Sequence, residues 1–388
     1  MKYLFIVQGE GRGHLTQALS LQQKLQEEGH EVVGALVGKS PARELPRFFT
    51  ERFTAHGSVV EQFRSPNFLP KSTGRRSNLL LSVLYNLLVM PCYVRSILRL
   101  RRVVRQTEAD VVVNFYELLA GLTYLLCQPR TPMVCIAHQY SFLHPGYQFP
   151  PDAHLVELFM LRFFTRLTCL GASKILALSL RDMQPARGIT IVPPLLRQEV
   201  LALEPRRGSY LHGYLLRSSY APQVIAWHRR HPDVEMHFFW DKRDAQEQTT
   251  FDGNLHFHRL DDQLFLRYMS CARAYATTAG FESVCEAIYL DKPLLMVPTH
   301  IEQMCNAHDT LLMATGVSAN AFDLDRLLAL ADRLPVHNGV FRHWVHQADH
   351  IFIEQLSQPI PSRARPLQRL RRAAAACYSH AAVLFTRF

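Results

Sequence analysis

The apolar positions along the chain alternate between short runs and longer stretches with helical spacing. Residues 2–7 and 31–37 are short apolar runs, and residues 15–27 between them repeat apolar side chains at helical spacing. This order predicts a strand, a helix and a second strand, the unit that joins two parallel strands. Further strand-like runs, separated by helical stretches, occur at 111–113, 133–137, 175–178 and 190–192. We therefore expect a parallel sheet covered by helices in the first part of the chain.

A second series of the same kind follows a segment rich in proline. Pro193, Pro194, Pro205 and Gly208 interrupt the pattern, and we interpret residues 195–208 as a linker. Later strands are expected at 210–216, 235–240 and 255–258. The whole pattern predicts an α/β protein with two Rossmann-like domains. Their expected limits are 1–194 and 209–335, with a helix that returns to the first domain at 336–357 and a basic tail at 358–388.

Length and composition agree with two domains of ordinary size. A chain of 388 residues that is 48% hydrophobic is larger than one ordinary core requires. Its eight cysteines form no C-x-x-C pair and no zinc spacing, and its 19 histidines include no H-E-x-x-H motif. Because the first residues read as a strand rather than as a signal peptide, we expect a cytoplasmic protein with reduced cysteines and no metal.

The formal charge of +10 is concentrated in two segments. Nine basic and no acidic residues lie between Glu61 and Glu108, and six arginines and no acidic residue lie beyond residue 360. These segments hold 15 of the 43 Lys and Arg residues, which leaves 28 basic against 33 acidic residues elsewhere. The basic charge is therefore a local property of two segments.

An uncharged apolar stretch, residues 79–94, lies inside the first basic segment and contains Pro91. It is shorter than the roughly 20 residues that span a bilayer, so it favours an interfacial hairpin over a transmembrane helix. Each basic group near anionic lipid contributes on the order of 1 kcal/mol, so we predict peripheral attachment to the inner face of the cell membrane. The alternative is a buried helix with solvated basic flanks. Nucleic-acid binding is disfavoured, because aliphatic residues are interleaved with the charge.

The loop after the first predicted strand is rich in glycine and ends in a histidine. Gly9, Gly11 and Gly13 allow a tight turn and a close approach of substrate to the backbone, and His14 follows at the start of the predicted helix. The spacing is not the G-x-G-x-x-G of dinucleotide-binding loops, and no acidic residue ends the next strand, where ribose would need one. A nicotinamide dinucleotide is therefore disfavoured.

The most specific polar pattern lies in residues 277–307. Thr278 and Gly280 end a predicted strand, and a helix is expected to begin at Phe281. The free N–H groups and the dipole at such a helix start can receive a diphosphate. Glu286 lies inside the same helix, where its carboxylate can accept hydrogen bonds from two ribose hydroxyls.

Glu302 and Gln303 follow the next apolar run, at the edge of the sheet where open α/β folds place ligands. One interpretation is a buried strand-helix-strand unit with incidental polar residues. The order and spacing instead resemble the UDP-sugar-using glycosyltransferase families 1 and 28, of the GT-B fold, which carry the stretch HCGxNSxxEA, a Pro-flanked strand, and then DQ and N. Four residues match as they stand: Gly280, Ser283, Glu286 and Ala287.

The spacing between the two halves of the motif is also that of family 1. Glu302 lies 16 residues after Glu286, and Asn306 follows Gln303 by three. Thr278 takes the place of the family's histidine. Phosphate binding would then rest on Thr278, backbone amides and the hydroxyl of Ser283.

The resemblance implies two domains that face a cleft, with His14 as the general base. Imidazole suits this role near neutral pH. A partner that orients the ring is expected after the strand that ends near residue 113, where Glu117 and Asn114 are the candidates. Gly11 and Gly13 would line the cleft beside it. The alternative for His14 is a residue that only hydrogen-bonds backbone or phosphate.

Other cleft residues follow from the same architecture. His138 ends another strand-like run and is expected to face the cleft, although a structural role is equally compatible with its position. Arg217, Ser218 and Ser219 follow the first strand of the second domain and are expected to help hold the diphosphate, with an ordinary polar turn as the alternative. Residues 258–262 match the region where relatives recognise the nucleotide base, so uracil is implied by the resemblance alone.

The resemblance implies a UDP-sugar-dependent hexosyltransferase that transfers sugar to an acceptor hydroxyl with inversion, without a metal or a further cofactor. Glu302 and Gln303 would hold hydroxyls of the sugar. The apolar stretch with basic flanks is similar to the acceptor domain of the family-28 enzyme that glycosylates a polyprenyl-linked precursor, so we expect a lipid or lipid-linked acceptor. The alternatives are a UDP-sugar epimerase of the same fold and a non-catalytic nucleotide-sugar-binding protein at the membrane.

Overall fold

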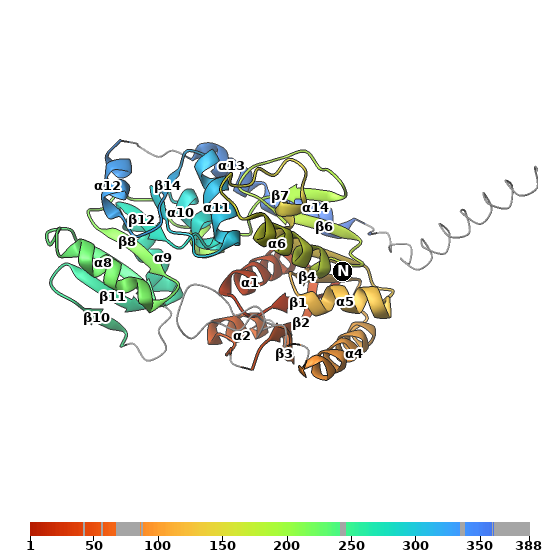
Figure 1. The fold of residues 1–388 in the computed structure, drawn as a ribbon. Helices are drawn as coiled ribbons and strands as arrows, with labels where there is room; N and C mark the ends of the chain where they lie inside the picture. The colour runs from red at the N-terminus through yellow and green to blue at the C-terminus, as the bar shows by residue number, and fades with distance from the viewer. Residues whose placement is uncertain are drawn as a thin grey trace, which may run out of the picture.

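The computed structural model describes residues 1–41, 43–55, 57–66, 86, 88–240, 246–333, 338–358 and 360. In this part of the chain, two seven-stranded sheets with their covering helices form two neighbouring α/β domains (Figure 1). The first sheet ends with a strand at Val192 and the second begins with one at Leu211. The predicted fold class, α/β with two Rossmann-like domains, is confirmed.

The first sheet contains only parallel strands, in the order β3-β2-β1-β4-β5-β6-β7. The strands are β1 (Lys2–Gln8), β2 (Glu31–Lys39), β3 (Val59–Arg64), β4 (Val111–Phe115), β5 (Met133–Ala137), β6 (Lys174–Leu178) and β7 (Ile189–Val192). Its main helices are α1 (Arg12–Glu27), α2 (Arg47–Thr54), α4 (Met90–Gln106), α5 (Leu118–Cys127) and α6 (Leu155–Thr168). All residues of β4 and β5 are buried, because helices cover both faces of a parallel sheet.

The second sheet has the order β10-β11-β9-β8-β12-β13-β14, and only β10 runs antiparallel to its neighbour. The strands are β8 (Leu211–Leu215), β9 (Met236–Trp240), β10 (Gln248–Thr250), β11 (Leu255–Arg259), β12 (Ala274–Thr277), β13 (Leu294–Met296) and β14 (Gly316–Ser318). Its main helices are α8 (Ala221–His228), α9 (Asp262–Cys271), α10 (Phe281–Tyr289), α11 (Ile301–Leu312) and α12 (Leu324–Arg333).

The last two helices carry the chain back to the first domain. They are α13 (Gly339–His346) and α14 (Ala348–Ser357). Lys24 on α1 forms an ion pair with Asp349, and the Tyr3 hydroxyl donates to the carbonyl oxygen of Leu356 over 3.2 Å. The chain therefore passes between the domains twice, once through the segment that contains α7 (Gln198–Leu201) and once through α13.

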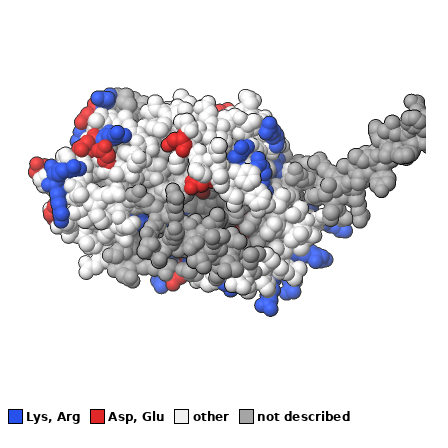
Figure 2. All heavy atoms as spheres, viewed as in Figure 1, with Lys and Arg blue, Asp and Glu red and all other residues white. Residues whose placement is uncertain are grey.

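The predicted membrane segment is only partly described. Residues 79–85 and 87 of the apolar stretch 79–94 lie outside the described residues, as does the tail beyond residue 360. The remainder leads into α4, where Met90, Val94 and Leu98 are about half exposed. In the described part of the chain, no helix is long and apolar enough to cross a membrane. On the face shown in Figure 2, most of the visible Lys and Arg side chains lie toward the two sides, and acidic side chains are visible nearer the middle.

Candidate active site

His14 lies in the first turn of α1, where the glycine-rich loop meets the helix. Gly11 occupies the N-cap position in an extended conformation, and α1 begins at Arg12. The ring is buried, with 7% of the residue exposed, and it stacks on Tyr116 with 5.5 Å between the ring centroids. Tyr116 follows β4, the neighbour of β1 in the sheet, so two adjacent parallel strands bring these side chains together.

Two carboxamides hold the His14 ring. Its Nδ1 lies 3.2 Å from Oε1 of Gln17, and its Nε2 lies 3.3 Å from Nε2 of Gln139. An amide oxygen only accepts and an amide NH2 only donates, so Gln17 accepts the proton on Nδ1 and Gln139 donates to Nε2. This pattern requires the Nδ1–H tautomer, with the lone pair of His14 on Nε2.

The surroundings of His14 keep it neutral. Burial and, to a smaller extent, the charge of His138 lower the pKa of His14 to about 4, against the opposing effects of Gln17 and Glu302. A buried imidazole with neutral hydrogen-bonding partners loses more from desolvation of its charged form than it gains from them. The ring is therefore uncharged at physiological pH, with one unprotonated nitrogen.

His138 and Glu302 connect the two domains directly beside His14. His138 begins the short 3-10 turn His138–Leu143 after β5, and its Nε2 lies 3.1 Å from Oε1 of Glu302 on α11. Its ring stacks on Phe281 with 4.4 Å between centroids and an interplanar angle of 4°. Gln139 Nε2 also donates to Glu302 Oε1 over 3.3 Å. The structure thus brings together a histidine expected on the acceptor side and a carboxylate expected on the donor side.

The carboxylate of Glu302 is held in its ionised form. Burial raises the pKa of Glu302, but the hydrogen bond and charge of His138, together with the charges of His300 and His14, outweigh burial and lower it to about 2. Glu302 therefore stays negative throughout the physiological range.

Glu117 does not lie against His14. It caps the N-terminus of α5, where its Oε1 accepts hydrogen bonds from the Leu119 amide over 3.0 Å and from the Ser65 hydroxyl over 2.5 Å. Asn114 donates to the carbonyl oxygen of Thr168 and accepts from the Glu117 amide. Within the described residues, His14 forms hydrogen bonds with Gln17 and Gln139 and none with Glu117 or Asn114. No contact therefore supports the predicted orienting role of Glu117 or Asn114.

Two residues beside the crevice adopt left-handed backbone conformations that favour glycine. Tyr116 has φ of 60° directly after β4, and Ala279 has φ of 64° just before α10. Such conformations are costly for residues with a Cβ and persist where the surrounding structure holds them, often at functional sites. Tyr116 stacks on His14, and Ala279 directly precedes Gly280, the N-cap of α10.

The polar residues of the second-domain motif shape the loop before α10. Gly280 is the N-cap of α10, and the hydroxyl of Ser283 donates to its carbonyl oxygen over 3.2 Å. Asn306 donates to the carbonyl oxygen of Ala279 over 3.2 Å, and Oε1 of Gln303 accepts from the amide and hydroxyl of Thr299. Thr278 is buried in the same loop. The bonds of Ser283 and Asn306 hold the loop before α10, and those of Gln303 hold the loop before α11.

Glu286 is buried and paired with Arg197. Both Nε and Nη2 of Arg197 donate to its Oε1, over 2.8 and 2.5 Å. Burial raises the pKa of Glu286, and the charge and hydrogen bonds of Arg197 oppose that shift. Sequence analysis missed Arg197, because it lies in the proline-rich linker and no local spacing connects it to a carboxylate 89 residues away.

Glu282 is a second functional candidate that sequence analysis missed. It lies in the first turn of α10, and Nε2 of Gln17 on α1 donates to its Oε1 over 2.5 Å. Burial raises the pKa of Glu282 to about 8, although the hydrogen bond from Gln17 lowers it. A Cβ on Gly13 would lie only 3.2 Å from Cγ of Glu282, so glycine allows the starts of α1 and α10 to approach closely.

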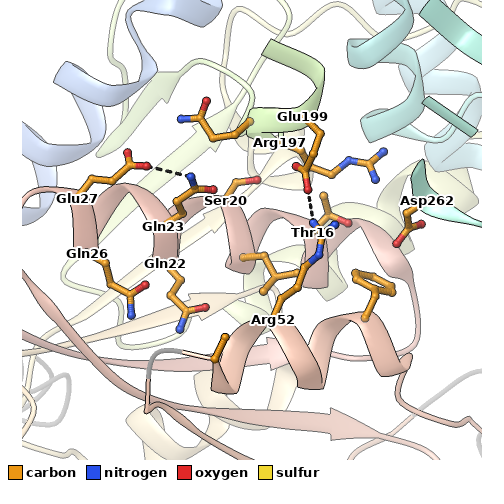
Figure 3. A pocket seen from close by; sticks show the side chains of 14 residues that line it. Thr16, Ser20, Gln22, Gln23, Gln26, Glu27, Arg52, Arg197, Glu199 and Asp262 are labelled. Carbon is orange, nitrogen blue, oxygen red and sulfur yellow. Dashed lines mark hydrogen bonds and ion pairs between the residues drawn. The ribbon is translucent and has the colours of Figure 1, made fainter. Parts of the chain in front are cut away.

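A pocket of about 610 Å³ opens next to the Arg197–Glu286 pair (Figure 3). Side chains of α1 and α2, residues 197–199 of the linker and Asp262 of α9 line it. Two ion pairs bridge its walls, one between Arg52 and Glu199 and one between Arg12 and Asp262 at 3.2 Å. Figure 3 shows Asp262 at the start of α9 and Arg197 in the linker beside α7.

Arg217 and Ser218 lie at the same edge of the second sheet. They follow β8 and are exposed, with Ser218 opening a short 3-10 turn, Ser218–Tyr220. Burial lowers the pKa of His300, and the nearby charge of Arg217 contributes to the same shift, whereas Glu302 opposes it. Arg217 is thus near the start of α11. Among the described residues, no group of three or more His, Cys, Asp or Glu side chains is arranged to hold a metal ion.

Comparison with known families decides the class of this interdomain site. The sequence model described as glycosyl transferase family 1 matches residues 1–335. The chain belongs to that family. This glycosyltransferase is therefore a transferase, as the motifs around His14 and Glu286 indicated. A search of curated proteins gave no match.

Solved structures show that this glycosyltransferase has the GT-B fold. The glycosyltransferase of kitacinnamycin is 16% identical with a TM-score of 0.63, and the match covers 93% of this chain and 99% of that one. The spinosyn rhamnosyltransferase SpnG, complexed with thymidine diphosphate, is 15% identical with a TM-score of 0.59, covering 92% and 100%. Phytolacca americana UGT2, complexed with UDP-2-fluoro-glucose and pterostilbene, is 12% identical with a TM-score of 0.55, covering 97% and 99%.

Proposed function

We propose that this glycosyltransferase moves a sugar from a UDP-sugar to an acceptor hydroxyl, with inversion and without a metal. The observation that carries the proposal is the unprotonated Nε2 of His14, which accepts a hydrogen bond from Gln139 that an acceptor hydroxyl would replace, between the two domains and close to Glu302 and the start of α10. A base with its lone pair in the crevice is what attack by a hydroxyl requires.

The reaction follows from these positions. Nε2 of His14 takes the proton as the acceptor oxygen forms its bond to the anomeric carbon, and the bond from that carbon to the UDP oxygen breaks. The negative charge on departing UDP falls on the N–H groups and dipole at the start of α10. Thr278, Gly280, Phe281 and Ser283 surround that helix start. Attack from the His14 side and departure on the α10 side give inversion.

The donor is proposed to lie along α10 toward Glu286. Both hydrogen bonds from Arg197 end on Oε1 of Glu286, so we assign the ribose hydroxyls to Oε2. Glu302 and Gln303, at the start of α11, would hold hydroxyls of the sugar, with Arg217 and Ser218 near the diphosphate. The uridine choice is supported by family resemblance and by a relative whose structure holds UDP-2-fluoro-glucose.

We propose a lipid or lipid-linked acceptor at the inner face of the cell membrane, in keeping with a cytoplasmic protein. Support comes from α6, which exposes Leu155 (81%), Phe159 (63%) and Phe163 (46%). An exposed apolar helix face of this kind is typical of interaction with a membrane or a partner. Phe164 of the same helix contacts Tyr116, with 6.1 Å between the ring centroids, so α6 borders the acceptor side of the crevice.

The charge beside α6 suits anionic lipid. Arg162 and Arg166 lie on α6, and burial together with the charges of Arg166 and Arg187 lowers the pKa of Arg162. Clustered arginines next to an apolar face favour an anionic bilayer surface over an uncharged one.

Two experiments test these assignments. Purified protein is incubated with single UDP-sugars, with and without a lipid extract, and products are identified by mass spectrometry. Transfer that requires the extract supports the proposal, whereas a changed sugar without acceptor would identify an epimerase, and tight binding without any turnover would identify a sensor.

The membrane assignment is tested by sedimentation with phosphatidylglycerol-containing vesicles. Phe159→Ser combined with Phe163→Ser should reduce the bound fraction, and Val340→Ser, which removes an exposed apolar side chain from α13, serves as the control. Binding that is indifferent to lipid charge or to the α6 substitutions would contradict the assignment.

A further inference from the structure

Three side chains from the two domains form a continuous hydrogen-bonded series. His14 and Gln17 lie one turn apart on the same face of α1, and Glu282 lies in the first turn of α10. The distances are 3.2 Å from His14 Nδ1 to Gln17 Oε1 and 2.5 Å from Gln17 Nε2 to Glu282 Oε1. Gln17 is almost completely buried, so water does not compete for its amide.

The series has a direction. Nε2 of Gln17 donates to Oε1 of Glu282, and a carboxyl group that carries its proton on Oε2, as the raised pKa of Glu282 favours, keeps Oε1 as an acceptor that requires the NH2 of Gln17 on its side. The amide oxygen of Gln17 is then turned toward His14 and requires a proton on Nδ1. A rotated amide would place two acceptors, Gln17 Oε1 and Glu282 Oε1, against each other. It would also offer a donor to His14 Nδ1 and so move the ring proton to Nε2, where the lone pair is needed.

We propose that Gln17 and Glu282 are positioning residues that, together with the NH2 of Gln139 at Nε2, hold His14 in its Nδ1–H tautomer. Gln17 supplies the hydrogen-bond acceptor for Nδ1 of His14, and Glu282 fixes the orientation of the Gln17 side-chain amide. The inference rests on the proposed role of His14 as the base. It assigns to an amide of the first domain and a carboxylate of the second the orienting function that sequence analysis expected of Glu117 or Asn114.

The arrangement links the base to the donor domain. Glu282 belongs to the helix start proposed to receive the diphosphate, and it meets Gln17 only where α1 and α10 approach at Gly13. The correct tautomer of His14 is therefore specified by contact between the domains. The first domain alone offers Gln17 no carboxylate at this position.

The first test is steady-state kinetics of Gln17→Leu. Loss of the acceptor should lower kcat on the order of 10- to 100-fold, less than the full contribution of a general base, and leave KM for the UDP-sugar nearly unchanged. Gln347→Leu is the matched control, because Gln347 also hydrogen-bonds an imidazole, that of His343, but on the surface of α13 and α14. An unchanged kcat in Gln17→Leu would overturn the proposal.

The second test exchanges the two functional groups. Gln17→Glu alone places two carboxyl groups against each other and should lower kcat. Combining it with Glu282→Gln restores the direction, because a carboxylate at 17 accepts from His14 and from the new amide at 282. We expect kcat of the double variant to exceed that of Gln17→Glu by about tenfold. This factor corresponds roughly to the free energy of one hydrogen bond to a charged group. No recovery would contradict the assigned order of donors and acceptors.

The third test reads the tautomer itself. Nitrogen NMR of protein labelled with 15N-histidine distinguishes a protonated from an unprotonated ring nitrogen, and the His14 signals are identified by their loss in His14→Gln. The wild-type protein should show the Nδ1–H form, and Gln17→Leu should shift the population toward Nε2–H. A wild-type Nε2–H form would overturn the proposal, even if the variants do not fold.

These readouts separate the two levels of inference. If His14→Ala transfers sugar normally, the proposed base is wrong whatever the NMR shows. If His14→Ala is inactive while Gln17→Leu is fully active with an unchanged tautomer, the assignment of His14 as the base is supported. The assignment of Gln17 and Glu282 as positioning residues is then wrong.

Discussion

The two ends of the interdomain crevice hold their functional groups by different means. At one end, His14 is held by the uncharged amides of Gln17 and Gln139. At the other, Glu286 is held by the guanidinium of Arg197 in a buried ion pair. Amides fix a ring without adding charge, so burial keeps the imidazole neutral and able to take a proton. A cation instead opposes the rise that burial causes in the pKa of Glu286, and so favours a carboxylate that accepts hydrogen bonds. The type of partner follows from the charge state that each end requires.

The largest effect is expected from removing the neutral base. His14→Ala should lower kcat/KM by about 10²- to 10⁴-fold, the range of general-base contributions, while the affinity for UDP stays nearly unchanged. The measurement pairs steady-state transfer with calorimetric titration of UDP. Equal loss of both quantities would mean that His14 serves binding rather than proton transfer, and the contrast between the two ends would disappear.

Breaking the ion pair between Arg197 and Glu286 should mainly lower the free energy of unfolding and the affinity for UDP. Glu286→Ala leaves Arg197 buried without its partner, which should lower the free energy of unfolding by about 3–5 kcal/mol. UDP affinity should fall with it, because the proposed ribose acceptor is gone. Chemical denaturation and UDP titration report the two effects. Glu61→Ala breaks the exposed pair with Arg99 and should cost less than about 1 kcal/mol.

A wild-type UDP dissociation constant in a folded Glu286→Ala protein would remove the ribose assignment. A stability loss no larger than that of Glu61→Ala would instead show that the buried pair is not what holds this end of the crevice together.

The His138–Glu302 contact lies between the two ends and combines an imidazole with a carboxylate. His138→Ala removes one hydrogen bond to a charged group, worth about 1.5 kcal/mol, so kcat should fall on the order of tenfold. The pKa of Glu302 should rise from about 2 toward its ordinary value, because its main opposing partner is lost. A pH profile of kcat that gains a step in the acidic range would show this, and an unchanged profile would contradict it.

The smallest effect concerns a neutral group of the first domain. Burial raises the pKa of Glu117 to about 7, against the hydrogen bonds from Ser65 and Leu119. As pH rises, the folded protein therefore retains this proton after the unfolded chain has lost it. The contribution of protonated Glu117 to the free energy of unfolding is complete below about pH 4.5 and is lost as pH rises through 7. Glu117→Gln should reduce by a few degrees the fall in Tm between pH 5 and pH 8. An identical pH dependence of Tm would contradict the buried, protonated state.

The sequence supports prediction of buried elements better than of exposed ones. Strands such as β4 and β5 read as continuous apolar runs because both of their faces are covered. β3 was not predicted, since only Phe63 is buried in it, and the wholly exposed β10 carries no hydrophobic pattern. The exposed face of α6 was missed for the opposite reason, because its apolar residues read as core.

Site residues that lie within one continuous motif could be predicted from the sequence. Site residues that meet only because two distant segments pack together could not. His14, Glu286 and Glu302 lie in continuous motifs with family spacing. Arg197 and Gln139 reach those residues only through the packing of the domains, which no local spacing encodes. Gln17 was within reach of prediction, because a polar residue three positions after His14 on a helix shares its face.

The return of α14 gives the molecule an unusual mechanical layout. His30 bridges the two ends of the described fold, with the Met1 amino group 3.3 Å from its Nδ1 and the Ser357 hydroxyl 3.1 Å from its Nε2. Both ends thus belong to the first domain, and the second is an insertion between them. An optical trap that pulled on Met1 and Ser357 would load β1 against α14 first. The lobe that carries α10 would feel no tension until that contact had sheared.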